Sequence, residues 1–248
     1  MEKCLNCGTE LVGNFCHNCG QQKLAPGISV RNSFDEYFYK SIYWESSFSY
    51  TVRDLFLAPG NFVLNFINGK RKDYVKPVGF FLMTVGFFIL MFHFLSENHF
   101  SYMKPIFIGE DTSEMIDSNI SVNDFRQLEV SRLNYLMFML PPILALFHTI
   151  IFRNKDVGYG ERLAFYLYIL GFGALISVIF LGLALITPVM WELRLIPLAV
   201  YYIYAIVQFS KANIFSGIIK ALIVLIAGNA VYYGIVTLLL WGYLELVH

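Results

Sequence analysis

Apolar residues in this chain gather into long uninterrupted stretches, separated by shorter segments that carry most of the charges. A helix needs about 20 consecutive apolar residues to cross the hydrocarbon core of a bilayer. The pattern therefore predicts an all-α polytopic membrane protein with about five transmembrane helices. The predicted spans are residues 77–95, 133–152, 163–187, 191–209 and 221–244, which together place a helical bundle in residues 77–248. The fourth is the weakest, because its charge-free part runs only from Leu195 to Phe209.

The charges between these stretches predict which side of the membrane each loop faces. Residues 96–132 carry more acidic than basic side chains, whereas basic residues dominate the segments before span one and after spans two and four. Lys and Arg in short loops favour the cytoplasmic side. We therefore expect a multi-pass protein of the cell's inner (plasma) membrane, with its amino terminus in the cytoplasm and its carboxyl terminus outside. The basic residues that set this orientation are Lys70, Arg71, Lys72, Lys76, Arg153, Lys155, Arg162, Lys211 and Lys220.

Composition supports the membrane interpretation and narrows the partners. Hydrophobic residues make up 57% of the chain and charged residues only 15%, against about 45–50% and about 25% in a typical soluble domain. Lys+Arg and Asp+Glu balance at 18 each, so we expect no nucleic-acid partner. Membrane lipid is the expected environment of the bundle.

All four cysteines lie within the first twenty residues, in two Cys-x-x-Cys-Gly knuckles. The spacing lets both thiolates of a knuckle reach one ion, and the glycine adopts the positive φ that the turn needs. Two such knuckles predict a closed zinc site of structural type in a small zinc ribbon, residues 1–25. Two adjacent disulfides or free thiols are the alternative. The predicted ligands are Cys4, Cys7, Cys16 and Cys19, and the glycines are Gly8 and Gly20.

Residues 26–76 alternate aromatic residues with charges, and none of the apolar stretches among them is long enough to cross a bilayer. Phenylalanines recur there at helical spacing, which predicts amphipathic helices lying on the cytoplasmic membrane surface. A basic cluster follows just before the first span and acts as a topology signal. The same charges are a candidate site for anionic lipid headgroups. The cluster consists of Lys70, Arg71, Lys72 and Lys76.

Few polar side chains fall inside the predicted spans. His93 and His148 lie near the ends of spans that run in opposite directions, so we expect interfacial histidines that do not meet. An interhelical hydrogen bond explains Asn229, and an interfacial pair explains Glu192 with Arg194. The third span also carries small residues on one face, which predicts close helix packing within one bundle. They are Gly171, Gly173 and Ser177.

The region before and into the first span resembles a known family signature. Residues 50–60 read Tyr-Thr-Val-Arg-Asp-Leu-Phe-Leu-Ala-Pro-Gly, and residues 66–71 read Phe-Ile-Asn-Gly-Lys-Arg, followed by Tyr74, Pro77 and Phe80. With the ribbon, this pattern is similar to an uncharacterised bacterial membrane family, catalogued as domain of unknown function 3667. The resemblance implies membrane location and a zinc ribbon, and it implies no activity.

Two positions depart from that family, which tends to have histidines where this chain has Arg162 and Tyr168. The departure weakens the idea of an intramembrane metal or proton site in that stretch. The five-span arrangement also loosely resembles trafficking proteins of the Yip1 type, which is an analogy of architecture alone.

No catalytic constellation is present: the chain has no His-Glu-x-x-His, no Gly-x-Ser-x-Gly and no phosphate-binding glycine loop. We therefore do not expect an enzyme. The favoured function is a membrane scaffold or adaptor whose cytoplasmic zinc ribbon docks a protein partner. The alternative is a small-solute or lipid transporter, which should line its mid-membrane path with more polar residues than this chain has.

Overall fold

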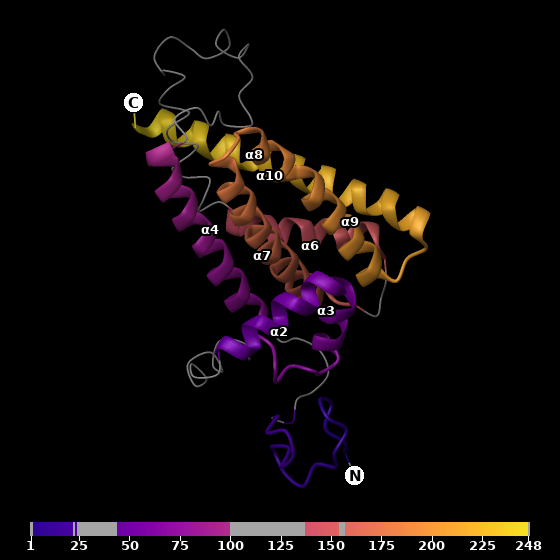
Figure 1. Ribbon diagram of the computed structural model, residues 1–248. Coiled ribbons are helices and arrows are strands. Elements are labelled where there is room, and N and C mark those ends of the chain that lie inside the picture. Colours follow the sequence, from indigo (N-terminus) through magenta and orange to yellow (C-terminus); the bar gives the residue numbers. More distant parts are fainter. Residues whose placement is uncertain (1, 22, 24–43, 100–136, 154–156, 248) are drawn as a thin grey trace.

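A computed structural model describes residues 2–21, 23, 44–99, 137–153 and 157–247, and these residues form helices apart from the amino-terminal ribbon (Figure 1). The predicted all-helical fold is confirmed for this part of the chain. The elements are α2 (Trp44–Leu57), α3 (Pro59–Ile67), α4 (Pro77–His99), the 3-10 turn η2 (Met137–Met139), α6 (Leu140–Ile151), α7 (Tyr159–Ala184), α8 (Val189–Leu193), α9 (Leu195–Ser210) and α10 (Ile214–Val247).

Four helical segments of the described residues are long and apolar enough to cross a membrane. They are Pro77–Leu95, Tyr159–Ala184, Val189–Ser210 and Ile214–Leu239, which correspond to the first, third, fourth and fifth predicted spans. The fourth reaches spanning length because the short helix α8 precedes α9. These segments indicate a multi-pass membrane protein, as the hydropathy pattern predicts.

The second predicted span differs from the expectation. Its described helical part, Met137–Ile151, is shorter than the four spanning segments, and residues 133–136 lie outside the described residues. Pro141 and Pro142, which fall near the middle of the predicted span 133–152, stand in the first turn of α6. Proline is tolerated there because the first amides of a helix have no intrahelical partner. The five predicted spans are therefore four spanning segments and one short apolar helix.

The helix α7 lies at the centre of the bundle, between α4 and α9 (Figure 1). Near the start of both helices, Phe80 of α4 lies 5.8 Å from Tyr168 of α7, measured between ring centroids. Further along, Phe88 of α4 shares an apolar cluster with Leu181 of α7, so the two helices run parallel. By contrast, Phe165 of α7 stacks on Phe209 of α9, near the start of one helix and the end of the other. The helices α7 and α9 are therefore antiparallel.

Small residues let these helices approach closely. A Cβ added at Gly171 would lie 2.8 Å from the Thr84 hydroxyl oxygen of α4. One added at Gly173 would collide with the Tyr202 hydroxyl of α9. The predicted small-residue face thus packs on neighbours on both sides within one bundle, and Ser177 bonds back to the carbonyl of Gly173 at 2.9 Å.

The helix α3 packs its apolar face against the bundle. Phe62, Val63, Phe66 and Ile67 are buried in the same core cluster as residues of α7 and α9. The rings of Phe62 and Phe66 both meet Tyr168 edge-on, at 5.0 and 5.5 Å between centroids. The phenylalanines of α3, which the sequence pattern assigns to the lipid surface, therefore face protein. Residues 26–43 of the same predicted segment, and residues 22, 24 and 25 of the predicted ribbon, lie outside the described residues.

Candidate functional site

The four predicted ligands come together at the amino-terminal end of the molecule. The sulfur atoms of Cys4, Cys7, Cys16 and Cys19 all lie within 4.8 Å of one another. The Sγ atoms of Cys4 and Cys19 are 3.6 Å apart, and those of Cys7 and Cys16 are 3.5 Å apart. A tetrahedral ion with metal–sulfur bonds of about 2.3 Å separates its sulfurs by about 3.8 Å. The donor set and its spacing therefore fit a four-coordinate metal ion, and none of the four forms a disulfide.

The two knuckles have the same backbone geometry. The amide of Gly8 donates to the carbonyl of Cys4 at 2.8 Å, and the amide of Gly20 donates to that of Cys16 at 2.7 Å. Both glycines have positive φ, +77° and +69°, as the motif predicts. A side chain at either position would be strained, because only glycine adopts this conformation at little cost. Each knuckle therefore depends on its glycine for the turn that brings its two sulfurs together.

Cys7 is the most exposed of the four thiols and the one most readily deprotonated. Hydrogen bonds with Thr9, first with its side chain and then with its backbone, lower the pKa of Cys7 to about 6. Burial acts the other way on Cys19, where it raises the pKa to about 11. A metal binds thiolates and not thiols. Cys7 is therefore largely a thiolate near neutral pH, whereas Cys19 would release its proton to solvent if a metal ion bound there.

The ribbon sits on the loop that joins α3 to α4, residues 68–76, here called the α3–α4 loop. Gln21, which follows the second knuckle, is buried. Its side-chain amide donates to the carbonyl of Gly69 at 2.6 Å, and the amide of Arg71 donates to its oxygen at 3.4 Å. A Cβ added at Gly69, where φ is +109°, would lie 2.5 Å from the Leu5 side chain. Gln21 and Leu5 thus anchor the ribbon to the segment that leads into the first span.

The signature residues before the first span hold the α3–α4 loop in place. Arg71 donates to the carbonyls of Phe66 and Ile67, at 2.9 and 3.1 Å, and so satisfies the carboxyl end of α3. The hydroxyl of Tyr74 donates to the Asp54 carboxylate of α2 at 2.6 Å. These bonds tie α2, α3 and the loop into one unit.

The same loop also bonds to the bundle. The amide of Val75 donates to the Thr51 hydroxyl at 3.1 Å, and the Tyr168 hydroxyl of α7 donates to the carbonyl of Val75 at 2.6 Å. At the start of α3, the amide of Gly60 donates to the Gln208 side chain of α9 at 2.8 Å. A Cβ at Gly60 would lie 2.3 Å from the backbone nitrogen of Phe209, so only glycine fits this contact. The signature is therefore the set of residues that seats α2, α3 and the ribbon on the bundle.

The basic cluster is split by this arrangement. Lys70 and Lys72 are exposed, and Lys76 is half-buried at the start of the first span. The guanidinium of Arg71 is engaged with the end of α3 and lies 5.5 Å from the Phe66 ring centroid. Arg71 therefore has a structural role that the charge pattern does not reveal.

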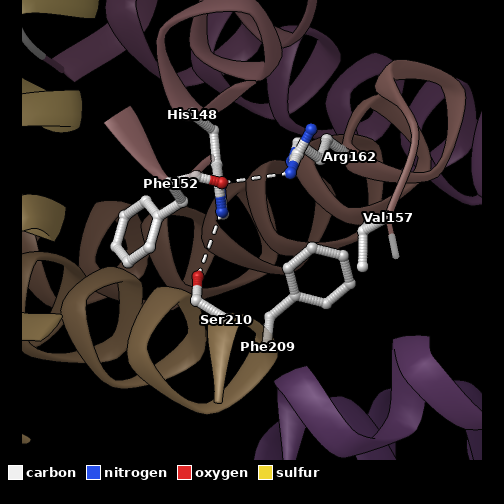
Figure 2. A pocket seen from close by; sticks show the side chains of 6 residues that line it. All are labelled: His148, Phe152, Val157, Arg162, Phe209 and Ser210. Atoms are coloured by element: carbon white, nitrogen blue, oxygen red, sulfur yellow. Dashed lines mark hydrogen bonds between the residues drawn. The ribbon is translucent and has the colours of Figure 1, made fainter. Parts of the chain in front are cut away.

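A second polar site lies inside the bundle, where the end of α9 meets α6 and α7, and Figure 2 shows the side chains that line it. His148 is only 1% exposed. Its Nδ1 lies 3.0 Å from the Tyr166 hydroxyl and its Nε2 lies 3.0 Å from the Ser210 hydroxyl. Behind it, Arg162 donates to the Thr149 hydroxyl at 3.3 Å and to the carbonyl of Phe152 at 3.2 Å. The pocket between His148, Arg162 and Ser210 has a volume of about 10 Å³, about the room of one water molecule.

The sequence pattern predicts His148 as an interfacial side chain, and the structure buries it. Its partners come from two other helices, 18 and 62 residues further along the chain. A run of hydrophobic residues does not reveal such partners. As predicted, it does not meet His93, which is exposed in the far half of α4.

The remaining polar candidates also differ from expectation. Asn229 donates to the carbonyl of Leu225 in its own helix at 2.8 Å, in place of a bond to a neighbouring helix. Arg194 donates to the carbonyl of Trp191, and its guanidinium lies 3.4 Å from that ring centroid. Among the ion pairs of the described residues, none joins Glu192 to Arg194. Both polar side chains thus bond within a turn or two of their own backbone.

Comparison with known proteins assigns no activity. A family model described as "Protein of unknown function (DUF3667)" matches residues 45–89. Searches of curated proteins and of solved structures found no match, and the likeness to Yip1-type proteins is not shown. The matched residues cover α2, α3, the α3–α4 loop and the first half of α4. The chain is therefore similar to this family of unknown function over the segment that seats the ribbon on the bundle.

Proposed function

We propose that this chain is a membrane adaptor whose ribbon, loaded with a structural zinc ion, presents an apolar edge to a cytoplasmic protein partner. The observation that carries the proposal lies in the turn between the two knuckles. Val12 is 89% exposed and Phe15 is 59% exposed, on a module that is otherwise anchored through Leu5 and Gln21. Exposed apolar side chains on a fixed small module are typical of a protein-docking surface.

The arrangement of the helices supports the orientation that the adaptor needs. Because α4 and α7 run parallel, the chain must come back to the end of the bundle where α4 starts before α7 begins. This crossing lies between His99 and Tyr159, and α6 is the helix described within that stretch. We propose that this return makes five passages, an odd number that would put the two termini on opposite sides of the membrane. In Figure 1, the labels N and C lie at opposite ends of the molecule. We place the ribbon in the cytoplasm of a bacterial cell, with the bundle in the inner membrane. Lys70, Lys72 and Lys76 then lie where they can meet anionic headgroups.

Affinity capture of the full-length protein from membranes tests the adaptor role. In Val12→Asp with Phe15→Asp, we expect the captured partner to be lost. Asn14→Asp is the matched control, because it adds a charge to the same exposed turn and removes no apolar side chain. The same captured proteins from all three forms would exclude the ribbon edge as the docking surface.

The orientation has its own test. A reporter fused after His248 should be active only outside the cytoplasm, and one fused before Met1 only inside. A reporter active in the cytoplasm at both ends would refute the odd number of passages.

The transporter alternative has weaker support. The pocket of about 10 Å³ beside His148 is too small for a solute larger than water. We therefore favour the adaptor.

A further inference from the structure

A basic groove opens at the ribbon end of the bundle, next to the buried site of His148. Its volume is about 360 Å³, and its lining comes from three places in the chain: the end of α6, the α9–α10 turn and α10. Phe152 and Ser210 line both this groove and the small pocket behind it. The groove residues are Phe152, Arg153, Ser210, Ala212 and Lys220.

Two cationic side chains line the groove, and neither forms an ion pair with an acidic side chain of the described residues. Arg153 is exposed, and Lys220 is half-buried with its ammonium 5.7 Å from the Phe152 ring centroid. The ion pairs found within the described ranges involve neither residue. A half-buried ammonium held over a ring at a groove mouth favours an anion from outside.

The hydrogen-bond chain behind the groove fixes which way Ser210 points its proton. The Tyr166 hydroxyl is buried, and within the described part of the chain its hydrogen-bond partner is His148. A buried phenol needs an acceptor for its proton. Tyr166 therefore donates to Nδ1 of His148, and the single imidazole proton then sits on Nε2.

The direction of the next bond follows. Nε2 donates to the Ser210 oxygen at 3.0 Å, so the Ser210 hydroxyl cannot donate back to the ring. Its own proton is directed elsewhere, and Ser210 lines the groove. Figure 2 shows Ser210 and His148 pointing at each other across the pocket. The groove thus offers one hydroxyl donor together with two cationic side chains, and the described residues that line it include no carboxylate.

We propose that this groove binds the phosphate group of an anionic lipid headgroup. Lys220 and Arg153 would contact the phosphate oxygens, Ser210 would donate a hydrogen bond, and Phe152 would form the apolar floor beneath the glycerol end. The shared chemistry is a phosphate oxyanion, which a free phosphate ion also offers. The lipid is favoured because the groove opens beside α10, whose neighbouring residues Ile218, Ile219 and Leu222 expose apolar side chains. This site is separate from the basic cluster at Lys70–Lys76.

The test uses the purified full-length protein in a neutral detergent. It is titrated with short-chain phosphatidylglycerol, short-chain phosphatidylcholine and inorganic phosphate, and binding is followed by calorimetry. We expect saturable binding of phosphatidylglycerol, with weaker binding of the other two. Lys220→Met and Arg153→Gln should each weaken it about tenfold or more, since each removes a charge-assisted bond. Ser210→Ala should weaken it by a smaller factor.

Lys211→Asn is the matched control. Lys211 is a neighbouring exposed cation that does not line the groove, and Asn tolerates its left-handed backbone, φ +50°. Its binding should equal that of the unaltered chain. Equal loss in Lys211→Asn would reduce the effect to general surface charge and overturn the site. Equal binding of phosphatidylcholine would overturn the anionic preference, and binding of inorganic phosphate as tight as that of the lipid would overturn the lipid as ligand. A wild-type protein that binds none of the three would overturn the proposal outright. Thermal melting of each variant separates lost binding from lost folding.

Discussion

The ribbon buries little besides its own cysteines, whereas the bundle buries a continuous core of aromatic and aliphatic side chains. Among residues 2–21, those that are buried are Cys4, Cys16 and Gln21. The main cluster of the bundle instead joins residues of α2, α3, α4, α6, α7, α9 and α10. If the proposed zinc ion is bound there, a module with so small a core would need it in order to fold. This difference predicts that the ribbon and the bundle unfold separately. The contacts of Gln21 and Leu5 with the α3–α4 loop then determine how strongly unfolding of one region destabilises the other.

The largest effect is expected from the metal ligands. Replacing Cys7 and Cys19 by serine should abolish metal binding, because neutral hydroxyls are poor ligands for zinc. The ribbon should unfold while the bundle keeps its thermal midpoint. Metal analysis of the purified protein and helix melting by circular dichroism measure the two parts. Iron in place of zinc, or a bundle that melts with the ribbon, would contradict the separation.

The next effect breaks the bundle and spares the ribbon. Gly60→Ala puts a Cβ against the backbone of Phe209, which cannot move aside as a side-chain tip can. We expect a loss of about 1–3 kcal/mol in the free energy of unfolding, as for overpacked cores, with metal content unchanged. Gly86→Ala in α4 is the control, since its Cβ meets nothing within 4 Å. Denaturation in detergent compares the two, and equal stabilities would show that α3 does not rest on α9 in solution.

A smaller effect is expected at the seam. Gln21→Leu keeps the size of the side chain and removes both hydrogen bonds to the α3–α4 loop. The buried carbonyl of Gly69 loses its hydrogen-bond donor, so the attachment of the ribbon to the α3–α4 loop should weaken by about 1–2 kcal/mol. Hydrogen exchange at the Arg71 amide and protease cleavage between residues 21 and 44 report the release. Unchanged exchange at Arg71 would mean that Leu5 alone holds the ribbon.

The smallest effect concerns pH and the bond between Tyr74 and Asp54. Burial and the Asp54 carboxylate raise the pKa of Tyr74 to about 12. A raised pKa stabilises the fold below the unfolded value of 10, and this stabilisation is lost as the pH rises towards 12. Tyr74→Phe should cost about 1 kcal/mol at neutral pH and remove this part of the alkaline dependence. Unfolding curves at pH 8 and pH 11 for both forms check the sign.

Hydropathy and cysteine spacing predict much of this molecule, because each depends on residues close together in sequence. The spacing of Cys4 and Cys7 by itself predicts a pair of metal ligands, and the apolar runs of residues 77–95 and 163–187 by themselves predict membrane-spanning helices. The fate of an amphipathic face does not follow from its own residues. The pattern of Phe62 and Phe66 is the same whether lipid or Tyr168 covers it.

The start of α6 and the burial of His148 could not be predicted from the sequence either, because both depend on structure outside the local pattern. Whether a helix kinks or starts at Pro141 depends on the backbone just before it, and there Met137–Met139 form a 3-10 turn. A hydropathy window treats this turn as more of the same span. From its position in the sequence, His148 is predicted to be interfacial. Its burial depends on hydrogen bonds with Tyr166 and Ser210, which lie in other helices and far along the chain.

The helices of this bundle differ in length, and that difference has a mechanical consequence. The apolar part of α10, Ile214–Leu239, has 26 residues, whereas that of α4, Pro77–Leu95, has 19. At about 1.5 Å per residue, these lengths are about 39 Å and about 28 Å, against a hydrocarbon thickness of about 30 Å. One bilayer cannot match both upright, and in Figure 1 α10 lies aslant. In a thicker membrane, α10 would be expected to tilt less and to shift against α6 and α9. A change in the acyl-chain length of the surrounding lipid would thereby exert a force on the end of the bundle that carries the ribbon.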